Sequence, residues 1–407
     1  MNMHQLKIFS PIGREREIVD EIADFDDFGR KTEVFFNDGI RYFVNEFWTA
    51  RQRQSNNLHE ISYRACFKAE LPRFFIERLS AFGELVYDPF MGRGTTLLEA
   101  NLLGRAVAGN DINPLSLRLI EPRLNPPAFR SVERRLDEIR LVRRTEKSDQ
   151  ELLAFYHPDT LVEIVALKNW LLEREGDGTL DGIDRWIRMV AVNRLTGHSS
   201  GFFSVYSLPP NQAVSVDSQL KINERRNQTP DYRDIKAIIR KKSKNLLSAG
   251  GRDSIAAPLL LTGNSSSTPQ LPDNSVSLIV TSPPFLDIVN YSQDNWLRCW
   301  FCGIDAQSIR IDKHKTVGDW ENFVRASFGE FARLVKSGGH VAFEVGEVRN
   351  GTVLLEKHVA KAVAGLPFEF LGVMVNDQEF TKTANCWGVG NNKGGTNTNR
   401  ICLFKRI

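Results

Sequence analysis

The sequence predicts an α/β protein, with a mostly parallel sheet of about seven strands and an inserted region that is mainly helices and loops. Short apolar runs rich in Val, Ile and Phe alternate with helical patterns, as in a parallel sheet covered by helices. Consecutive β and α patterns favour right-handed parallel crossovers. The alternation is broken from about Pro126 to Arg252, and 407 residues fit either one large domain with an insertion or two to three units.

Seven apolar runs are the candidate strands. They cover residues 85–87, 106–108, 259–261, 277–280, 340–345, 368–375 and 400–404. A Gly/Asn-rich segment, residues 387–399, joins the last two runs, which we expect to form an antiparallel pair.

One apolar stripe predicts a helix over residues 320–335. The stripe consists of Phe323, Phe328, Phe331 and Leu334. We expect Gly338-Gly339 to stop this helix.

Residues 126–255 are predicted to be an insertion between the second and third strands, possessing the length of a separate module. The catalytic part of the chain would then comprise residues 1–125 and 256–407. Helical patterns within the insertion cover residues 159–172 and 184–195. A loop-like segment rich in Ser, Gly, Pro, Asn and Gln follows over residues 197–228.

Composition places the chain among ordinary globular proteins, with 42% hydrophobic and 25% charged residues. No apolar run approaches the roughly 20 residues that cross a bilayer, and residues 1–21 lack the apolar core of a secretory signal. Five scattered cysteines favour a reducing cytoplasm over a disulfide framework. Cys299 and Cys302 have metal or redox spacing but lie in an apolar stretch, so we expect buried thiols and no metal site.

The first motif is Asp88-Pro89-Phe90-Met91-Gly92-Arg93-Gly94-Thr95-Thr96, which follows a strand and precedes a helical pattern. Its glycines allow a tight turn and close approach of the backbone to a ligand, and the helix N-terminus presents free N–H groups. A dinucleotide fingerprint would need a small residue where Leu97 stands. Asp111 follows the second strand, where this type of sheet holds ribose hydroxyls. A cofactor loop for adenosine with an amino-acid tail is therefore favoured over a merely structural turn.

The second motif, Thr281-Ser282-Pro283-Pro284-Phe285, directly follows an apolar strand. Proline has no N–H and fixes φ, so the carbonyls of this segment stay at the carboxyl end of the strand, where α/β proteins bind ligands. Carbonyls of Ser282 and Pro283 can hold the hydrogens of an exocyclic amine, and Phe285 can stack on an extruded base. The alternative is a rigid Pro-Pro loop with a purely structural role. The presence of the first motif in the same chain disfavours this alternative.

Together the two motifs resemble those of the amino-group DNA methyltransferases that use S-adenosylmethionine. Ser-Pro-Pro resembles the cytosine-N4 branch, whereas adenine-N6 enzymes more often carry Asp-Pro-Pro-Tyr. Phe67–Pro72 is similar to a segment that helps enclose the methionine part of the cofactor, and Gly338–Gly346 to the strand that follows. The order of cofactor motif, insertion and catalytic motif also resembles the family, whose target-recognition region lies in the middle.

The resemblance implies a Rossmann-like class I methyltransferase fold and assigns the site residues. Those expected to bind the cofactor are Phe67, Asp88, Phe90, Gly92, Gly94, Thr95, Thr96, Asp111, Asn264 and Thr281. Those expected to act in catalysis are Ser282, Pro283, Pro284 and Phe285. Asn264 stands where the family often has Asp, and Phe285 where Tyr is commoner. No cysteine follows a proline, so the nucleophile of cytosine-C5 methylation is absent.

The net charge of +3 conceals a basic segment within the insertion. Residues 221–252 hold ten Lys/Arg against three acids. The candidates for contact with DNA phosphates are Arg225, Arg226, Arg240, Lys241 and Lys242. Asn223, Asn227 and Gln228 could reach base edges. A solvated helix face is the alternative interpretation.

The function this predicts is a site-specific cytosine-N4 methyltransferase of double-stranded DNA, acting with a restriction system whose endonuclease is a candidate partner. Three alternatives stay open: an adenine-N6 DNA enzyme, an RNA or protein amine methyltransferase, and a DNA-binding subunit without activity.

Overall fold

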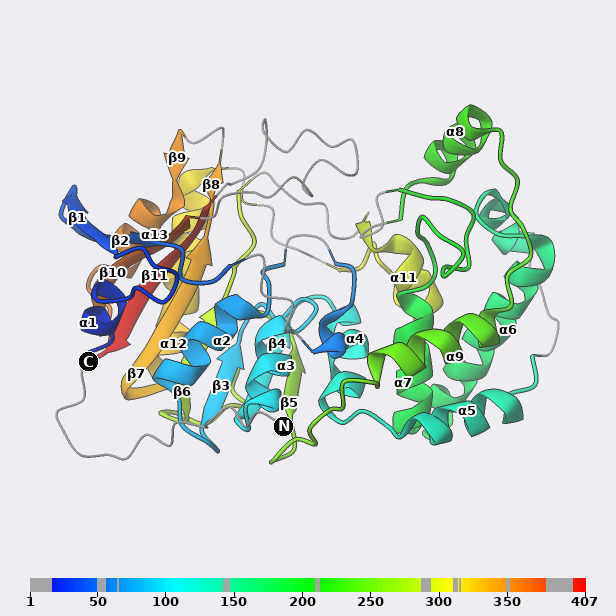
Figure 1. The fold of residues 1–407 in the computed structure, drawn as a ribbon, viewed down its shortest axis with the longest axis horizontal. Helices are drawn as coiled ribbons and strands as arrows, with labels where there is room; N and C mark the ends of the chain where they lie inside the picture. The colour runs from blue at the N-terminus through cyan, green and yellow to red at the C-terminus, as the bar shows by residue number, and fades with distance from the viewer. Residues whose placement is uncertain are drawn as a thin grey trace.

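A nine-stranded sheet is the centre of the computed structural model (Figure 1). The model describes residues 17–49, 56–63, 66–141, 147–208, 213–286, 294–309, 314, 316–348, 352–377 and 398–407. The strands in chain order are β1 (Glu33–Asn37), β2 (Ile40–Asn45), β3 (Leu85–Asp88), β4 (Ala106–Asp111), β5 (Leu259–Thr262), β6 (Val276–Thr281), β7 (Val335–Val345), β10 (Phe368–Asp377) and β11 (Thr398–Arg406). Their order across the sheet is β1-β2-β10-β11-β7-β6-β3-β4-β5. A separate two-stranded sheet pairs β8 (Glu347–Val348) with β9 (Val353–Leu354).

All seven predicted strands are present, as β3, β4, β5, β6, β7, β10 and β11. The five from β5 to β7 across the sheet run parallel. The predicted antiparallel pair is also confirmed, because β10 pairs with β11 antiparallel.

The prediction of about seven strands missed the hairpin of β1 and β2, which adds to the sheet beside β10. Every residue of β1 is exposed, so it lacks the buried alternation that marks a strand in a sequence. Asp38 and Gly39 form the two-residue turn with φ of 50° and 77°, as the type I′ turn of a tight hairpin requires.

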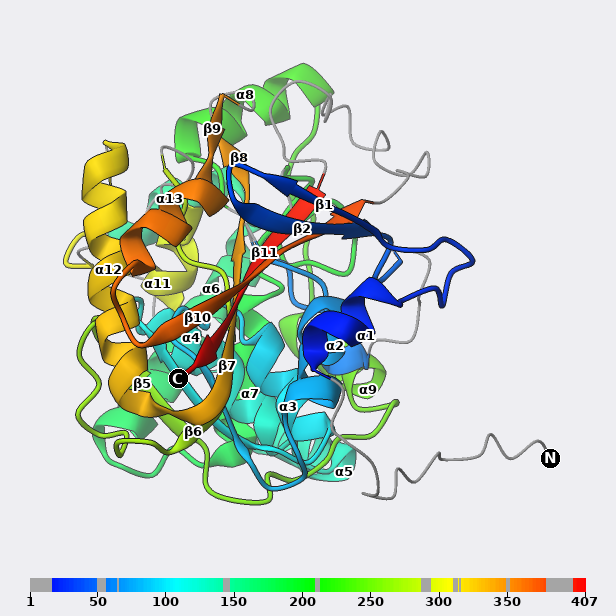
Figure 2. The same ribbon diagram turned by 90° about the vertical axis from the view of Figure 1, so that its left-hand side faces the viewer.

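Helices cover both faces of the sheet, with α12 (Val317–Leu334) and α13 (Leu355–Val363) on one side and α1 (Ile18–Ala23) and α2 (Glu70–Leu79) on the other (Figure 2). Successive strand residues point to opposite layers. Val86 packs with the α1 and α2 side, whereas Tyr87 packs with the α12 and α13 side. Also on the α2 side lies α3 (Thr95–Leu102), which follows β3.

The predicted helix over residues 320–335 is confirmed as α12, but its predicted stop is wrong. The helix ends at Leu334 and passes directly into β7, which contains both Gly338 and Gly339. A Cβ at Gly339 would lie 2.9 Å from the Ser277 carbonyl oxygen. The glycine therefore allows β7 to approach its neighbour and does not cap a helix.

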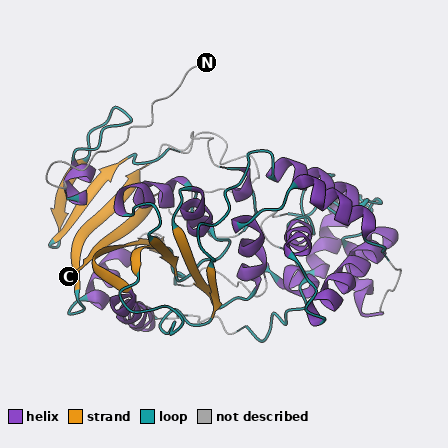
Figure 3. Cartoon of the chain, turned by 90° about the horizontal axis from the view of Figure 1, so that it is seen from below, coloured by secondary structure: helices purple, strands orange, loops and turns teal. Residues whose placement is uncertain are grey.

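Between β4 and β5 the chain forms a helical region at one end of the molecule (Figures 1 and 3). Its elements are α4 (Leu115–Leu124), α5 (Phe129–Glu138), the 3₁₀ segment η2 (Lys147–Ala154), α6 (Pro158–Gly176), α7 (Gly182–Val192), α8 (Val216–Arg226) and α9 (Ile235–Leu246). The two helices predicted here are present as α6 and α7. The loop expected over residues 197–228 is wrong in part, because it contains α8.

This region has its own hydrophobic core, which also takes in residues from elsewhere in the chain. Leu58 and Tyr63 join it beside the short 3₁₀ helix η1 (Asn57–His59), and α11 (Trp296–Phe301) joins it after β6. Boundaries of an inserted module at residues 126 and 255 remain a prediction.

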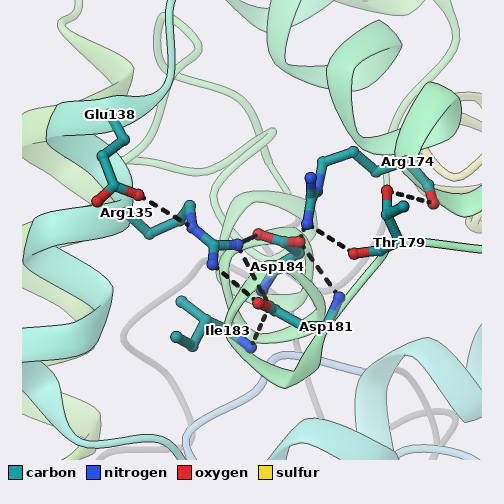
Figure 4. Close-up of polar contacts among 7 residues, drawn as sticks. All are labelled: Arg135, Glu138, Arg174, Thr179, Asp181, Ile183 and Asp184. Carbon is teal, nitrogen blue, oxygen red and sulfur yellow. Dashed lines mark hydrogen bonds and ion pairs between the residues drawn. The ribbon is translucent and has the colours of Figure 1, made fainter.

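A buried carboxylate ties three helices of this region together (Figure 4). Asp184 on α7 is fully buried and pairs with Arg135 of α5 and Arg174 of α6. Asp181 caps α7 and also pairs with Arg135 at 2.8 Å. Charges removed from water need such pairing, so this network fixes how α5, α6 and α7 pack.

Candidate active site

A cavity with about 940 Å³ of empty space, counting its part open to solvent, lies at the carboxyl ends of β3, β4 and β6. This edge of the sheet faces upward in Figure 1. The label β8, which marks the strand directly after the carboxyl end of β7, lies near the top of the picture. The residues that line it are Tyr63, Cys66, Phe67, Asp88, Pro89, Phe90, Met91, Gly92, Arg93, Thr95, Asp111, Ile112, Asn113, Gly263, Asn264, Ser265, Ser282, Pro284 and Phe323. Both sequence motifs therefore contribute to one cavity, at the edge where open α/β sheets bind ligands.

The glycine loop is held by the acid at the end of β4. The Gly92 amide donates to Asp111 Oδ2 at 2.8 Å, and Asp111 Oδ1 accepts from the Asn113 amide at 2.8 Å. Burial raises the pKa of Asp111. Each carboxylate oxygen can accept a second hydrogen bond, so Asp111 can hold the loop and still accept from a ribose hydroxyl.

Gly94 lies at the N-terminus of α3 with φ of +77°, a left-handed conformation that favours glycine. A Cβ at this position would lie 2.4 Å from Ile120 Cγ1 on α4. The glycine is thus required both by the turn and by the close approach of α4.

Asp88 connects the two motifs, which lie far apart in the sequence. It accepts from the Thr281 hydroxyl at 2.6 Å and from the Phe90 amide at 3.1 Å. Thr96 adds a second link by donating to the Val280 carbonyl at 3.0 Å. Burial raises the pKa of Asp88 to about 7. The end of β6 is therefore held directly against the cofactor loop.

The proline loop leaves two carbonyls available. Trp320 on α12 donates from Nε1 to the Pro284 carbonyl at 2.9 Å, although the indole ring is otherwise buried in the core. Within the described part of the chain, the carbonyls of Ser282 and Pro283 accept no hydrogen bond. These are the two that the sequence predicted as acceptors for an amine.

Glu344 on β7 is the functional group that the sequence did not single out. It is buried beside Ser282, since Thr281 pairs with Phe343 across β6 and β7. The Asn399 amide donates to its carboxylate, and the Ser282 hydroxyl lies close enough to favour the charged form. Burial raises the pKa of Glu344 to about 7 despite these neighbours. A lone acid in the apolar run Val341–Val345 was the signal that could have identified it.

Arg93 attaches the upstream segment to the glycine loop. Its guanidinium donates to the Ile61 carbonyl at 2.8 Å and to the Phe67 carbonyl at 3.1 Å. This brings Tyr63, Cys66 and Phe67 to the wall of the cavity. Of these only Phe67 was predicted, because the other two carry no motif.

The structure separates the predicted residues into lining and supporting positions. Those that line the cavity are Phe67, Asp88, Phe90, Gly92, Thr95, Asp111, Asn264, Ser282 and Pro284. Those outside its lining are Gly94, Thr96, Thr281, Pro283 and Phe285. Phe285 packs against the core on the α12 side instead. Phe323 of α12 lines the cavity and lies 5.5 Å from Phe90 between ring centroids.

The five basic residues predicted to meet DNA lie on two helices. Arg225 and Arg226 end α8, whereas Arg240, Lys241 and Lys242 belong to α9. Lys242 is largely buried against Glu60, and Arg240 pairs with Asp137 at 2.6 Å. Among the described residues, Arg225, Arg226 and Lys241 are exposed and have no ion pair.

The strand order β5-β4-β3-β6-β7-β11-β10, with only β11 antiparallel to its neighbours, defines the Rossmann-like class I methyltransferase fold. The cavity fits S-adenosylmethionine: buried acids end two neighbouring strands, glycines expose the backbone, and aromatic rings supply an apolar wall. Among the described residues, no group of His, Cys, Asp or Glu could hold a metal ion, and no helix could cross a membrane.

Comparison with known proteins agrees with this class. A family model described as DNA methylase matches residues 31–122. The type II methyltransferase M.BsoBI of Geobacillus stearothermophilus is 24% identical over 390 residues, covering 80% of this chain and 71% of that protein. The type II methyltransferase M.MvaI of Kocuria varians is 33% identical over 98 residues, covering 23% of this chain and 20% of that protein.

Among solved structures, an S-adenosylmethionine-dependent methyltransferase of Methanosarcina mazei is similar with a TM-score of 0.34 and 10% identity, over 82% of this chain and 97% of that one. The chain is thus similar to DNA methylases over residues 31–122 and to a type II methyltransferase over most of its length.

Proposed function

We propose that the protein methylates the exocyclic N4 amine of a cytosine flipped out of double-stranded DNA, at a specific site and within a restriction-modification system. The observation that carries this proposal is the pair of available carbonyls on Ser282 and Pro283, beside the cofactor cavity and the buried Glu344. The relatives named above are type II methyltransferases, which supports the restriction context.

Within the cavity, the chain's own residues would hold each part of the cofactor. Asp111 would accept from the ribose, and Phe90, Phe323 and Asn264 would surround the adenine. Gly92 and Phe67 would border the methionine part. When bound, S-adenosylmethionine supplies a methyl group on a positively charged sulfur.

The target base must leave the duplex to reach this cavity. Carbonyls of Ser282 and Pro283 would then accept the two amine hydrogens and draw the nitrogen lone pair out of conjugation with the ring. Trp320 and Asp88 hold the loop from its two ends, through Pro284 and Thr281. Such pre-positioning, with fixed dipoles at the reacting nitrogen, is the main source of rate for a direct displacement.

Methyl transfer leaves one proton too many on the amine nitrogen, and the chain must accept it. Glu344 is a buried carboxylate with a raised pKa, and it lies beside Ser282 on the neighbouring strand. We assign it as the proton acceptor, with the Ser282 hydroxyl passing the proton. A pKa of about 7 suits this task near neutral pH.

DNA binding is assigned to the helical region, where Arg225 and Arg226 end α8. In Figure 1 this helix lies toward the top, as does the carboxyl edge of the sheet. The choice of cytosine over adenine rests on Ser-Pro-Pro-Phe, since the carbonyl pair would accept either amine.

The substrate class can be tested by incubating the protein with tritiated S-adenosylmethionine and equal masses of unmodified plasmid DNA, RNA and cell protein. Label is expected in the DNA fraction alone, and the Ser282→Ala variant should lower it while binding the cofactor normally. Label that enters only RNA or protein would reject the proposal.

A further inference from the structure

A second hollow lies in the helical region, away from the cofactor cavity. It is lined by residues of the segment after α7 and of the end of α8, including His198, Ser199, Tyr206, Arg226, Gln228 and Arg233. Hydroxyl, imidazole, amide and guanidinium groups and one carboxylate, that of Asp231, therefore line one concave surface. Neither of the sequence motifs contributes to it, and the cofactor has no part in it.

The floor of this hollow is a tightly bonded loop, residues 197–207. The Ser207 amide donates to the Gly197 carbonyl at 2.9 Å, and the Gly197 amide donates to the Ser204 hydroxyl at 3.2 Å. A Cβ at Gly197 would lie 2.4 Å from the ring of Phe202, so the turn is closed over that ring. Phe203 is fully buried in the core beneath the loop. The surface is thus preformed.

Amide side chains of α8 and of the residues just after it brace the rim of the hollow. Gln219 and Gln228 both donate to the Tyr206 carbonyl, at 3.1 and 3.0 Å, and both donate to Asn223 Oδ1. Asn223 in turn donates to the Ala154 carbonyl at 2.7 Å. Asn223 and Gln228, which the sequence suggested as base readers, are therefore used inside the protein to hold Tyr206 in place.

Arg226 is stacked on the ring of Tyr206, which these hydrogen bonds hold in place. Its guanidinium carbon lies 3.7 Å from the centre of the Tyr206 ring, which places the guanidinium over the ring face. Within the described residues, it has neither a hydrogen bond nor an ion pair. Stacking fixes the orientation of the guanidinium and leaves its N–H groups free. Two of these N–H groups can donate parallel hydrogen bonds to two neighbouring acceptor atoms.

The charged neighbours differ from Arg226 in this respect. Arg233 also lines the hollow, but its guanidinium pairs with Asp231 at 3.5 Å. Asp231 is exposed, so this pair is screened by solvent. The hollow consequently offers one stacked and unpaired cation, Arg226, beside the Arg233–Asp231 ion pair.

We infer that Arg226, stacked on Tyr206, is a clamp for a pair of acceptor atoms on the DNA substrate. This inference rests on the proposed DNA methylation. Two sources on DNA present that chemistry: the two free oxygens of a backbone phosphate, and the O6 and N7 atoms of guanine in the major groove. The same hollow is lined by the Ser199 hydroxyl and the His198 ring, which could contact the phosphate or the guanine beside Arg226.

The test is binding of a mixed-sequence 30-base-pair duplex to the full chain, measured by fluorescence anisotropy over a range of salt concentrations. The variants are Arg226→Ala and, as the control, Arg134→Ala. Arg134 is exposed on α5 at the opposite end of the helical region (Figure 1), so its removal changes the net charge equally. Cofactor affinity and melting temperature report whether each variant is intact.

We expect Arg226→Ala to bind DNA about tenfold more weakly than Arg134→Ala at equal salt. A phosphate contact would lower the slope of log affinity against log salt by about 1 and weaken all sequences alike. A guanine contact would leave that slope nearly unchanged and broaden the set of methylated sites, read by sequencing DNA modified by each variant.

DNA affinity and site choice of Arg226→Ala that equal those of Arg134→Ala would overturn the inference. If the wild-type chain still labels DNA in that case, the proposed function stands and only the clamp is rejected. A wild-type chain that labels no DNA would reject both. Arg226→Lys adds a further distinction, since lysine keeps the charge but not the planar pair of donors.

Discussion

The indole nitrogen of Trp320 donates a hydrogen bond to the carbonyl oxygen of Pro284 at 2.9 Å. Trp320 lies in the first turn of α12 and is fully buried, so its indole N–H reaches the catalytic loop from within the core. Of the three carbonyls in Ser282-Pro283-Pro284, this contact takes one, and the other two accept no hydrogen bond from the described residues.

Trp320→Phe is expected to lower kcat about 5- to 50-fold with little change in the cofactor Kd. Phenylalanine keeps most of the packing but leaves the Pro284 carbonyl without its partner, which allows the loop to move from its productive position. Steady-state kinetics and calorimetry with S-adenosylmethionine measure the two quantities.

A matched control is Trp186→Phe, because Trp186 is equally buried and donates from Nε1 to Ser243 at 3.0 Å in the helical region. It should lose about 1–3 kcal/mol of stability, as Trp320→Phe should, without the loss of kcat. Equal kcat values for the two variants would show that the Trp320 contact is only structural.

Glu344→Gln is expected to lower kcat about 10²- to 10⁴-fold, because glutamine cannot take up the amine proton. In the wild type, burial holds the pKa of Glu344 at about 7. The carboxylate is protonated below that pH and cannot act, so kcat should fall about tenfold per pH unit below pH 7. The residual rate of the variant should lack this dependence.

Asp88 supplies the comparison, since burial raises its pKa to about 7 as well. It accepts from Thr281 and Phe90, whereas Glu344 lies beside Ser282 on the neighbouring strand. A pH dependence that persists in Glu344→Gln but disappears in Asp88→Asn would assign the titration to Asp88 and remove Glu344 from the proposed proton path.

Gly94→Ala is expected to weaken cofactor binding at least tenfold. Alanine at φ of +77° costs about 1–2 kcal/mol, and its Cβ would collide with Ile120 at 2.4 Å, which displaces the loop from α3. Gly83→Ala carries the same backbone strain at φ of +83° with nothing near the added carbon. Only the first should change the cofactor Kd; a similar change in both would mean that global stability is the cause.

Asp184→Asn is expected to destabilise the protein by about 3 kcal/mol, because Arg135 and Arg174 lose a buried ionic partner. Asp137→Asn breaks an exposed pair with Arg240 and should cost less than about 1 kcal/mol. Urea unfolding of both variants measures the difference. Comparable midpoints would show that the Asp184 network contributes no more than a surface pair.

Strands buried on both faces were predictable, because a short continuous apolar run such as 277–280 is typical of a strand in the interior of a parallel sheet. The β1 and β2 hairpin was not, since Val34, Phe35 and Phe36 are exposed at the edge. Its turn, Asp38-Gly39, is typical of a tight hairpin, but a search for hydrophobic periodicity does not detect turn residues.

The site was predictable where a backbone conformation or a strand end dictates the residue, as for Gly94, Asp111 and Ser282. Trp320 and Glu344 were not, because each depends on a side chain from another strand or helix meeting the loop in three dimensions. Phe285 shows the reverse case: its position in the motif suggested stacking, whereas packing against the core takes its ring away from the cavity lining.

Methylation of an exocyclic cytosine amine can be tested through the identity of the modified nucleoside. DNA labelled by the wild-type protein would be digested to nucleosides and analysed by mass spectrometry, with Ser282→Ala as the control. We expect N4-methylcytosine as the labelled nucleoside, strongly reduced in the variant. Label found as N6-methyladenine would contradict the cytosine assignment, and label found as C5-methylcytosine would contradict the amine chemistry itself.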